Sequence, residues 1–215
     1  MRWLLLVVPA ACYSVVPHSR TTLLRAAAPG RAAAAKLQTL DLLSAVDSFY
    51  QTAPYQAAFL TCGVKASLSD TISQKTVEKV QSSTGEVSEH RFCFSRNFAF
   101  ILYGGLYQGV TQHVIFNEIY PAVFGSGTDL QTVAVKVLFD QLVLTPFLCL
   151  PIAYLVKAAV FQYPLQEGLD KYVMDAKKDL LWKYWAIWTP TQCLTFSVVP
   201  EHLRIPFIAM VSFFW

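Results

Sequence analysis

The sequence predicts an all-α integral membrane bundle of about four transmembrane helices. The evidence is the composition, one long apolar run and the charges between the apolar segments. The 215 residues are 54% hydrophobic and only 14% charged, with a mean hydropathy of +0.41. Soluble domains carry about 25% charged residues. Residues 133–161 contain only three charged side chains, Lys136, Asp140 and Lys157, and an apolar run of this length is typical of a membrane-spanning helix.

Three further segments, residues 54–74, 92–116 and 182–200, complete the four predicted spans. The first is amphipathic and only weakly apolar, and the last is rich in aromatic residues. A final apolar piece, residues 205–215, is too short to span a membrane alone. We expect it to continue the fourth segment beyond a break at Pro200.

The loops between these segments differ in charge. The first loop and the third loop carry basic residues, namely Lys75, Lys79, Arg91 and Arg96 in the first and Lys171, Lys177, Lys178 and Lys183 in the third. Residues 117–132, between the second and third segments, contain no Lys or Arg. Four spans place both basic loops on one side, and the positive-inside rule assigns that side to the cytosol, matrix or stroma.

The N-terminal segment resembles a targeting sequence. Residues 1–40 contain no Asp or Glu. A short apolar stretch, residues 3–11, resembles a secretory signal core, and the basic, Ala-rich residues that follow resemble an organelle transit peptide. Together they are typical of the two-part presequences of algae with complex plastids, and a mitochondrial presequence is the alternative. We therefore predict a removable presequence over residues 1–45 and a four-span membrane domain over residues 46–215.

The carboxylate of Asp140 is a candidate functional group, because inserting an acid at the centre of a membrane helix costs about 2.5–3.5 kcal/mol. It should face a partner or a water-filled cavity rather than lipid. One interpretation is a pore in which Asp140 sets a cation preference or a pH response. The other is an ion pair that holds helices in register, with Lys136 one turn earlier, or with Arg96 or Lys65, as the partner.

Further polar residues lie in or near the apolar segments. Each alone is commonly an interhelical hydrogen bond worth about 0.6 kcal/mol, but so many in four helices favour a narrow polar path between them. His113 would then titrate near neutral pH as a gate, or stay neutral and bond a neighbouring helix. The candidates for pore lining or helix clamping are Asp70, Gln74, Gln108, Gln112, His113, Lys136, Asp140, Gln141 and Gln192.

No enzyme motif accompanies these residues. The sequence contains no G-x-S-x-G, H-E-x-x-H or Walker A pattern, and the glycines of residues 104–109 have the wrong spacing for a dinucleotide loop. The five cysteines form no C-x-x-C, and the four histidines show no metal-ligand spacing. We expect no enzymatic activity, no cofactor and no metal. A net charge of +3 is too small to indicate nucleic-acid binding.

Spaced residues in all four segments resemble the Mpv-seventeen / PMP-twenty-two family of small organelle membrane proteins. The first segment matches P-x6-T-x-G-x6-D-x3-Q, and the second matches R-x7-G-x4-G-P-x2-H except for Val110 in place of Pro. The third matches K-x3-D-Q-x4-P, and the last matches W-P-x2-Q-x2-N-F-x2-V-P-x3-R-x10-W, with Thr189 and Thr195 in place of Pro and Asn. The motif residues assigned a structural part are Pro54, Gly63, Arg96, Gly104, Gly109, Pro146, Trp188, Phe196, Pro200, Arg204 and Trp215.

The resemblance covers residues 50–215 and implies a four-helix membrane bundle in a mitochondrial inner or peroxisomal membrane. Some members of the family behave as weakly selective pores for small solutes, and others are tied to reactive-oxygen handling and organelle DNA maintenance. We therefore expect a channel for small solutes or ions in a mitochondrial inner or plastid membrane, with the peroxisome as the alternative. The expected partners are the lipid bilayer, the solute and a second copy of the chain. A structural or scaffold protein without transport is the alternative function.

Overall fold

The computed structural model describes residues 31–77 and 92–214. Within these ranges the chain consists of helices and short connections without any β-strand, which confirms the predicted all-α fold. The chain divides into two compact units, Met1–Asp41 and Leu42–Trp215. Helix α1 (Arg31–Thr52) begins in the first unit. Residues 1–30 of the predicted presequence lie outside the described residues.

The larger unit contains two long helices with shorter helices around them, beginning with α2 (Pro54–Ile72) and its extension η1 (Ser73–Val77). The first long helix comprises α4 (Phe94–Leu102), η2 (Tyr103–Thr111), α5 (Gln112–Val114), η3 (Ile115–Ile119) and α6 (Tyr120–Phe124). The second comprises α7 (Leu130–Phe139), η4 (Asp140–Cys149) and α8 (Leu150–Val160). They are followed by α9 (Leu165–Lys178), α10 (Leu180–Ser197), η5 (Glu201–Leu203) and α11 (Arg204–Phe214).

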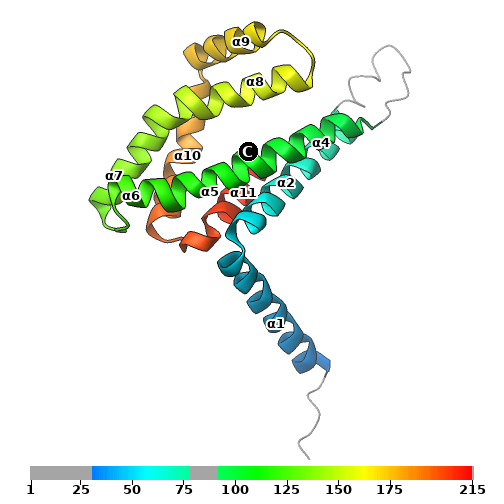
Figure 1. The fold of residues 1–215 in the computed structure, drawn as a ribbon, viewed down its shortest axis with the longest axis vertical. Helices are drawn as coiled ribbons and strands as arrows, with labels where there is room; N and C mark the ends of the chain where they lie inside the picture. The colour runs from blue at the N-terminus through cyan, green and yellow to red at the C-terminus, as the bar shows by residue number, and fades with distance from the viewer. Residues whose placement is uncertain (1–30, 78–91, 215) are drawn as a thin grey trace, which may run out of the picture. The chain divides into compact units, whose positions relative to one another are not determined.

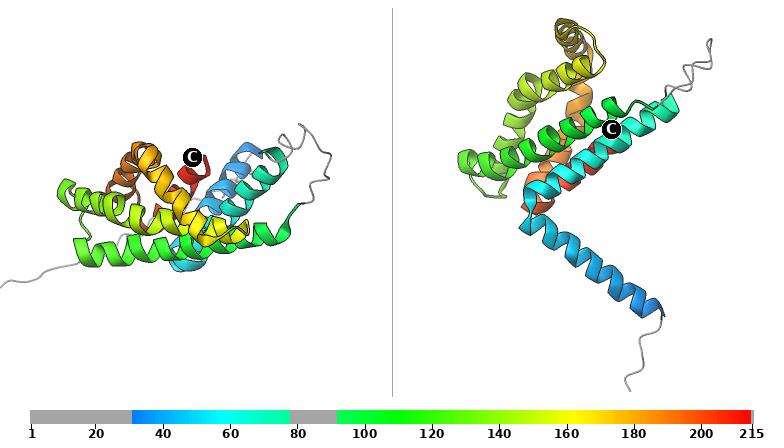
Figure 2. Two further views of the ribbon diagram at one scale, coloured as in Figure 1. Left: turned by 90° about the horizontal axis from the view of Figure 1, so that it is seen from above. Right: turned by 45° about the vertical axis from the view of Figure 1, so that its right-hand side comes forward.

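Helix α2 packs closely against the first long helix because both present small residues at the contact, and the two lie alongside each other in Figures 1 and 2. A Cβ atom added at Gly104 would lie 2.6 Å from the Ala66 Cβ, and one at Gly109 would collide with the Ala58 carbonyl oxygen. Ala58, Cys62 and Ala66 recur at four-residue spacing and so share one face of α2. These glycines let the two backbones approach.

Both long helices contain wide π-helical turns, a feature that often occurs at functional sites. In the first, the wide stretches are η2 and η3, and in the second the wide stretch is η4. Pro146 lies inside η4 and has no backbone N–H to give the helix. The second long helix bends between α7 and α8 (Figure 1), and the Tyr172 hydroxyl of α9 donates to the Pro146 carbonyl oxygen over 2.5 Å.

The helices of the larger unit share two ends, which we name after some of the charged residues that each carries. At one end the Tyr55 hydroxyl donates to Glu118 over 2.6 Å, and Arg204 donates to the Phe116 carbonyl oxygen over 3.2 Å. We call this the acidic end, after Glu118, Asp129 and Glu201. At the other end the Arg96 guanidinium lies 4.7 Å from the centre of the Phe161 ring. We call this the basic end, and its basic residues are Arg96, Lys171, Lys177 and Lys178.

The chain reverses direction after α10. Pro200 has an extended backbone (φ −55°, ψ 147°) that ends the helical path, and α11 runs back from the acidic end along α2. Ser212 near the end of α11 accepts a hydrogen bond of 3.1 Å from Lys65 in the middle of α2. The expectation that residues 205–215 continue the fourth segment is therefore wrong, because the turn at Pro200 reorients the chain. The segment between the third and fourth predicted spans also contains a helix, α9, that we had treated as a loop.

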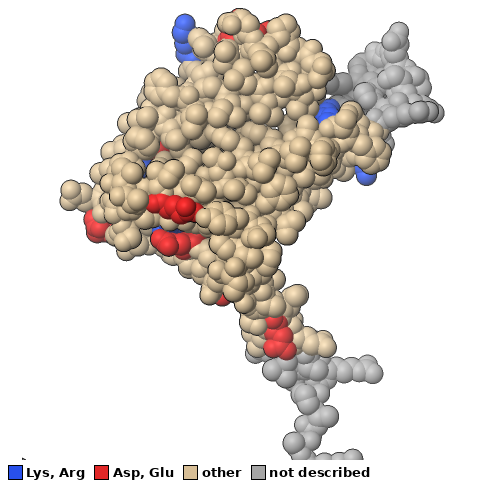
Figure 3. All heavy atoms as spheres, viewed as in Figure 1, with Lys and Arg blue, Asp and Glu red and all other residues tan. Residues whose placement is uncertain are grey.

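Polar side chains lie inside the larger unit, and many large apolar side chains lie outside it. Asp70, Lys136, Asp140 and Arg204 are all buried, with at most 5% of their surface exposed. The outward faces of the helices carry exposed apolar residues such as Leu60, Val64, Phe98, Leu106, Leu138, Leu142, Phe147 and Leu194. In Figure 3 uncharged atoms cover most of the visible face, with acidic atoms mainly over the α6–α7 end.

One helix of the described ranges, Leu130–Val160, is long and apolar enough to cross a membrane. Its most apolar window has a mean hydropathy of 1.9, and only 17% of that window is buried. A core helix of a soluble protein would be mostly buried, so the low burial favours a lipid-facing helix. The other three predicted segments are helical, but their helices do not meet the same test of length and apolar character.

Candidate functional site

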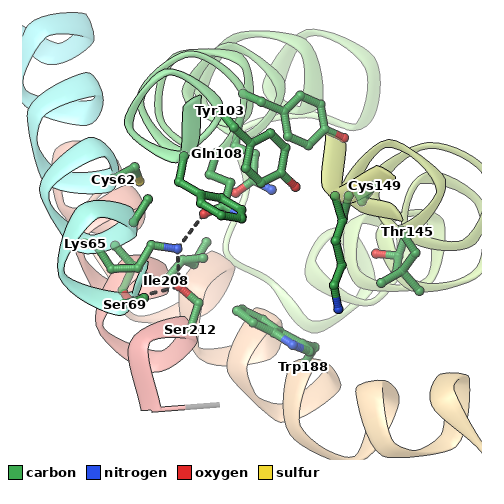
Figure 4. Close-up of a pocket in the computed structure, with 18 of the residues that line it drawn as sticks. Cys62, Lys65, Ser69, Tyr103, Gln108, Thr145, Cys149, Trp188, Ile208 and Ser212 are labelled. Atoms are coloured by element: carbon green, nitrogen blue, oxygen red, sulfur yellow. Dashed lines mark hydrogen bonds between the residues drawn. The ribbon is translucent and has the colours of Figure 1, made fainter. Parts of the chain in front are cut away.

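A cavity of about 570 Å³ lies between the helices of the larger unit. Its walls come from α2, the first long helix, η4 with α8, α10 and α11, so that segments far apart in the sequence share it. Figure 4 shows Lys65 and Cys62 of α2 on one side, Tyr103 and Gln108 above, and Thr145 opposite. Its size falls in the range of small-molecule sites, roughly 300–1,000 Å³.

Lys65 presents an ammonium group to this cavity. Its Nζ donates to the Gln108 Oε1 over 2.5 Å and to the Ser212 Oγ over 3.1 Å (Figure 4). Both acceptors are uncharged, and no carboxylate lies within ion-pair distance of Lys65 in the described part of the chain. Lys65 thus presents its amino group to the cavity without an ion-pair partner among the described residues.

Aromatic rings form two further parts of the wall. The rings of Tyr103 and Tyr107, on η2, stack with centroids 5.5 Å apart and an angle of 13°. The rings of Tyr184 and Trp188, on α10, stack with the same 5.5 Å separation and an angle of 22°. Such flat surfaces favour the apolar or planar part of an organic molecule.

Asp140 lies at the deep side of the cavity and accepts hydrogen bonds from three uncharged donors. The Tyr120 hydroxyl donates to Oδ1 over 3.0 Å, while the amide groups of Gln141 and Gln192 donate to Oδ2 over 2.8 and 3.1 Å. Asp140 is 2% exposed. The expected ion pair with Lys136, Arg96 or Lys65 is absent from the described ion pairs, which corrects that interpretation.

Asp70 forms a second polar cluster where α2 meets α4. Arg96 Nε donates to its Oδ1 over 2.8 Å, and the amides of Gln74 and Asn97 donate to its Oδ2 over 2.7 and 3.1 Å. Gln74 also accepts from the Cys93 backbone N–H over 2.7 Å. The cluster satisfies the backbone N–H of Cys93, one of the unpaired groups at the start of α4, and joins α2 to that helix.

The structure places some of the predicted polar residues in the cavity wall and others away from it. Asp70, Gln108, Gln112, Asp140 and Gln192 line the cavity. Gln74 and Gln141 support the two carboxylates from behind and do not line it. His113 lies towards the acidic end, where its ring meets the Asn117 amide at 3.0 Å and the Tyr55 ring edge-on at 5.2 Å.

Lys136 does not reach Asp140 although the two are one turn apart. Side chains on a helix lean towards its N-terminus, so Lys136 extends towards the acidic end. There it lies within electrostatic range of Arg204, Glu201 and Asp129. It is 1% exposed, and the described residues offer it no ion pair within 4.0 Å.

The motif residues assigned a structural part lie mainly at helix ends and contacts. Arg204 is buried and donates to the Asn117 side chain over 3.1 Å, and Phe196 is fully buried beneath it. Pro54 begins α2, and Pro200 precedes the turn into α11. Trp188 lines the cavity, whereas Trp215 lies outside the described residues.

Sequence reasoning missed part of the site. Lys65 was considered only as a partner of Asp140, and Tyr103, Tyr107, Tyr120 and Ser212 were not singled out. A lysine in the middle of a weakly apolar helix was the available signal, because intramembrane cations usually face a functional interior. Ser212 carried no such signal, since the reversal of α11 brings it to the site. No group of His, Cys, Asp or Glu within the described ranges is arranged to hold a metal ion.

The fold and the cavity define a helical bundle with many apolar side chains outside and several charged side chains buried inside, and known proteins resemble it in sequence. The family model described as Mpv17 / PMP22 matches residues 171–215. The chain is 29% identical over 157 residues to Protein SYM1 of Mycosarcoma maydis, which covers 73% of each chain. It is 26% identical to PXMP2/4 family protein 3 of Dictyostelium discoideum (82% and 90% covered) and 26% identical to Peroxisomal membrane protein PMP22 of Arabidopsis thaliana (77% and 80% covered).

The chain is thus similar to Mpv17 / PMP22 proteins in its last 45 residues and to curated relatives of that kind over about three quarters of its length. No solved structure matches it.

Proposed function

We propose that this protein is an organelle membrane channel that passes small solutes or ions through the polar cavity between its helices. The observation that carries the proposal is the cavity itself, about 570 Å³ in volume, whose mostly apolar wall includes charged and amide side chains from four parts of the bundle, namely α2, the two long helices and α10. Hydrophilic interiors inside apolar exteriors are typical of membrane conduits.

The exposed apolar residues support four membrane-crossing passes, although within the described ranges only one helix is apolar enough by itself. Inward-facing residues such as Lys65, Asp70 and Gln108 lower the average hydropathy of their helices without meeting lipid. A helix can therefore face lipid on one side although its mean hydropathy is too low for it to be identified as a membrane span. The four passes are α2, the first long helix, the second long helix and α10, while α11 covers α2 over half a span.

The proposed path begins at the basic end and narrows at Asp140. Lys157 and Phe161 are exposed residues of the cavity wall near the basic end. At the deep side, Asp140, Tyr120 and Phe196 are each at most 2% exposed. Their hydrogen bonds and rings close the way to the acidic end in this conformation. Conduction would then require Tyr120 and Gln192 to separate from Asp140.

Single-channel recording of the purified full chain in planar bilayers tests the proposal, with Asp140→Asn alongside. Discrete conductance that changes in Asp140→Asn would support a conducting path past this carboxylate. Glu167→Gln is the matched control, because it makes the same acid-to-amide change on α9, outside the cavity, at a residue that pairs with Lys171 at 2.9 Å. Silent bilayers containing demonstrably folded and inserted protein would overturn the proposal.

A scaffold without transport is the second candidate, and one observation favours it. Asp140 and Asp70 each receive three hydrogen bonds from protein donors, so both carboxylates are satisfied without any solute. In that case the clusters act as clamps between helices. The recording described above separates the two, since a scaffold gives no conductance. We propose no enzymatic activity, and turnover of an added substrate would contradict that.

The membrane of residence is proposed from the relatives. The Arabidopsis relative is named a peroxisomal membrane protein, and the acid-free, basic segment at residues 1–40 favours a mitochondrial or plastid membrane. Imaging a fluorescent fusion to the C-terminus, with and without residues 1–40, would separate these locations.

A further inference from the structure

The end of helix α1 has an apolar side and a polar side. Residues 42–52 of this helix belong to the larger unit. With 3.6 residues per turn, the large apolar side chains fall on one arc, which we call the apolar arc, namely Leu42, Leu43, Val46, Phe49 and Tyr50. The polar side chains fall on the remaining arc, namely Ser44, Asp47, Ser48, Gln51 and Thr52. Such an amphipathic helix requires an apolar surface along one side.

The described residues leave most of the apolar arc uncovered. The exposed fractions are 64% for Leu42, 60% for Leu43, 45% for Val46 and 39% for Phe49. Tyr50 is half-buried, and its hydroxyl lies 2.5 Å from the Thr61 Oγ1 of α2. A contiguous group of exposed apolar side chains marks a surface that binds another protein or a membrane.

A polar contact fixes the segment at the acidic end of the bundle. Asp47 Oδ1 lies 2.9 Å from Nε2 of His202 in η5, and Gln51 donates to the other Asp47 oxygen over 2.7 Å. Together with the contact of Tyr50 to α2, this pair sets the rotation of the segment about its own axis. The two contacts hold the segment against the bundle and leave the rest of the apolar arc open.

The connection to α2 fixes the level at which the segment lies. Only Ala53 separates α1 from α2, which begins at Pro54. Helical hydrogen bonds continue through this junction, since the Ala53 N–H donates to the Phe49 carbonyl oxygen and the Ala57 N–H to that of Ala53, both over 2.9 Å. Because α2 crosses the bilayer in the proposed topology, residues 42–52 must lie where α2 leaves it on the acidic side.

The segment is too short and too polar to enter the bilayer as a further span. Residues 42–52 rise about 16 Å along a helix, half of the roughly 30 Å of a hydrocarbon core. Within the described ranges, the helix that meets the test for a span is Leu130–Val160 and not α1. An amphipathic helix held at this level lies along the membrane surface, with its apolar side in the boundary between headgroups and acyl chains.

We infer that residues 42–52 form an interfacial helix whose apolar arc inserts into the lipid surface at the acidic end of the bundle. The occupant is lipid because the neighbouring α2 already turns exposed apolar residues such as Leu60 and Val64 outward from the same junction. Residues 42–52 contain no Lys or Arg, so apolar contact rather than attraction to anionic headgroups holds the helix. This inference goes beyond the proposed channel: it rests on the proposed membrane passes and not on conduction.

Nitroxide labels on the full chain in phosphatidylcholine vesicles test the inference. In a cysteine-free background, Val46→Cys reports the apolar arc and Ser48→Cys the opposite, exposed side of the same helix. Val64→Cys, at a 56% exposed position of α2, lies about 15 Å further along that helix and reports deep lipid. Val46 also remains if the predicted presequence over residues 1–45 is removed.

The measured quantity is the ratio of collision rates with oxygen, which concentrates in lipid, and with a water-soluble nickel chelate. We expect this ratio at Val46 to be at least about threefold higher than at Ser48 and lower than at Val64, because an interfacial helix buries its apolar side by only about 5–10 Å. Adding phosphatidylglycerol should leave the ratio at Val46 unchanged. A high ratio that appears only with this anionic lipid would contradict insertion by the apolar arc.

Variants assign the insertion to the apolar arc. Leu43→Gln together with Phe49→Gln should lower the ratio at Val46 at least about twofold, because two amides replace apolar contact with lipid. Ser48→Gln together with Thr52→Gln is the matched control, since it adds the same two amides to the polar arc, and it should leave the ratio unchanged. If the first pair abolishes the thermal unfolding transition, Leu43→Gln alone decides. An unchanged ratio at Val46 would then overturn the inference.

The three reporter positions separate this inference from the other proposals. A ratio at Val46 as low as that at Ser48, with a high ratio at Val64, would overturn the interfacial helix and leave the membrane passes in place. Shielding of Val46 from both reagents would overturn it in favour of a protein surface, and spectral broadening that disappears on dilution with unlabelled chain would identify a second copy. A low ratio at Val64 would overturn the passes together with the inference. Silent bilayers would overturn the channel alone.

Discussion

Arg96 and Asp70 form an ion pair of 2.8 Å in which the side chains are only 13% and 3% exposed. The pair joins the end of α2 to the start of α4, on either side of residues 78–91. Removing one member of such a pair leaves the other charge buried without compensation.

We therefore expect Arg96→Met to lower the free energy of unfolding by about 3 kcal/mol. Asp70→Asn should have a smaller effect, because the new amide still accepts from Gln74 and Asn97 through its oxygen. The double variant should lose less free energy of unfolding than the two single variants lose together, because neither charge is then left unpaired. Denaturant titration in detergent measures this cycle, and strict additivity would show that the pair is not coupled.

Asp140 should tolerate Asn but not Ala. Asn keeps an oxygen for Gln141 and Gln192, and the Tyr120 hydroxyl can turn to accept from the new amide group. Ala leaves all three donors without an acceptor, two of them on other helices, for a loss of about 1–2 kcal/mol. Unfolding midpoints of the two variants test this, and equal destabilisation would mean that charge rather than hydrogen bonding holds the cluster.

Gly109 and Gly63 offer a matched pair of glycine-to-alanine substitutions. At Gly109 the added methyl group would collide with the Ala58 carbonyl oxygen, whereas at Gly63 it would meet Ile101 at an ordinary 3.5 Å. Gly109→Ala should destabilise the bundle by about 1–3 kcal/mol. Gly63→Ala should be neutral or stabilising, because alanine favours helix. Both are measured as unfolding midpoints, and similar values would argue against close packing at Gly109.

Asp129 caps the second long helix from the loop at the acidic end. Its Oδ2 accepts from the Thr132 backbone N–H over 3.0 Å, and this bond holds the pKa of the Asp129 carboxyl below its usual value. A depressed pKa gives stability that is present above the unfolded-state pKa, about 3.9, and is lost as the pH falls through the folded-state pKa. The advantage of the wild type over Asp129→Asn should thus be present at pH 6 and shrink towards pH 3. An advantage that is independent of pH would contradict this.

The two ends of the bundle should lie on opposite sides of the membrane. In a cysteine-free background, Ser126→Cys marks the α6–α7 loop and Lys178→Cys marks α9, and both positions are exposed. A membrane-impermeant thiol reagent added to sealed vesicles should label one and spare the other. Labelling of both from the same side would contradict the four-pass topology.

The sequence carried enough information for the helices and for the inward placement of polar residues. Apolar runs of sufficient length can only be helices in a membrane, and the polar positions at residues 70, 108, 140 and 192 face inward because lipid excludes them. The observed helices differ from the predicted segments mainly because they are longer. The second predicted segment, for example, continues to Phe124.

The side chains that these residues contact could not be predicted from the sequence. Lys136 and Asp140 are spaced for an ion pair, but a base one turn before an acid is the weaker orientation, and donors from α6 and α10 satisfied the acid instead. The contact between Lys65 and Ser212 depends on a chain reversal at Pro200, which only three-dimensional packing decides. Local spacing therefore indicates which residues lie inside, and tertiary contacts determine which of them meet.

Charged side chains that are buried between helices need partners from other helices while the protein is being inserted into the membrane. The helix Leu130–Val160 can enter a bilayer on its own, but its Asp140 needs Gln192, which is synthesised some fifty residues later. Helix α2 is less apolar, and it needs Arg96 to pair with its Asp70 and Gln108 to accept a hydrogen bond from its Lys65. We expect the bilayer-inserting machinery to hold the early helices beside each other until α10 emerges, so that assembly rather than insertion is the slow step in making this protein.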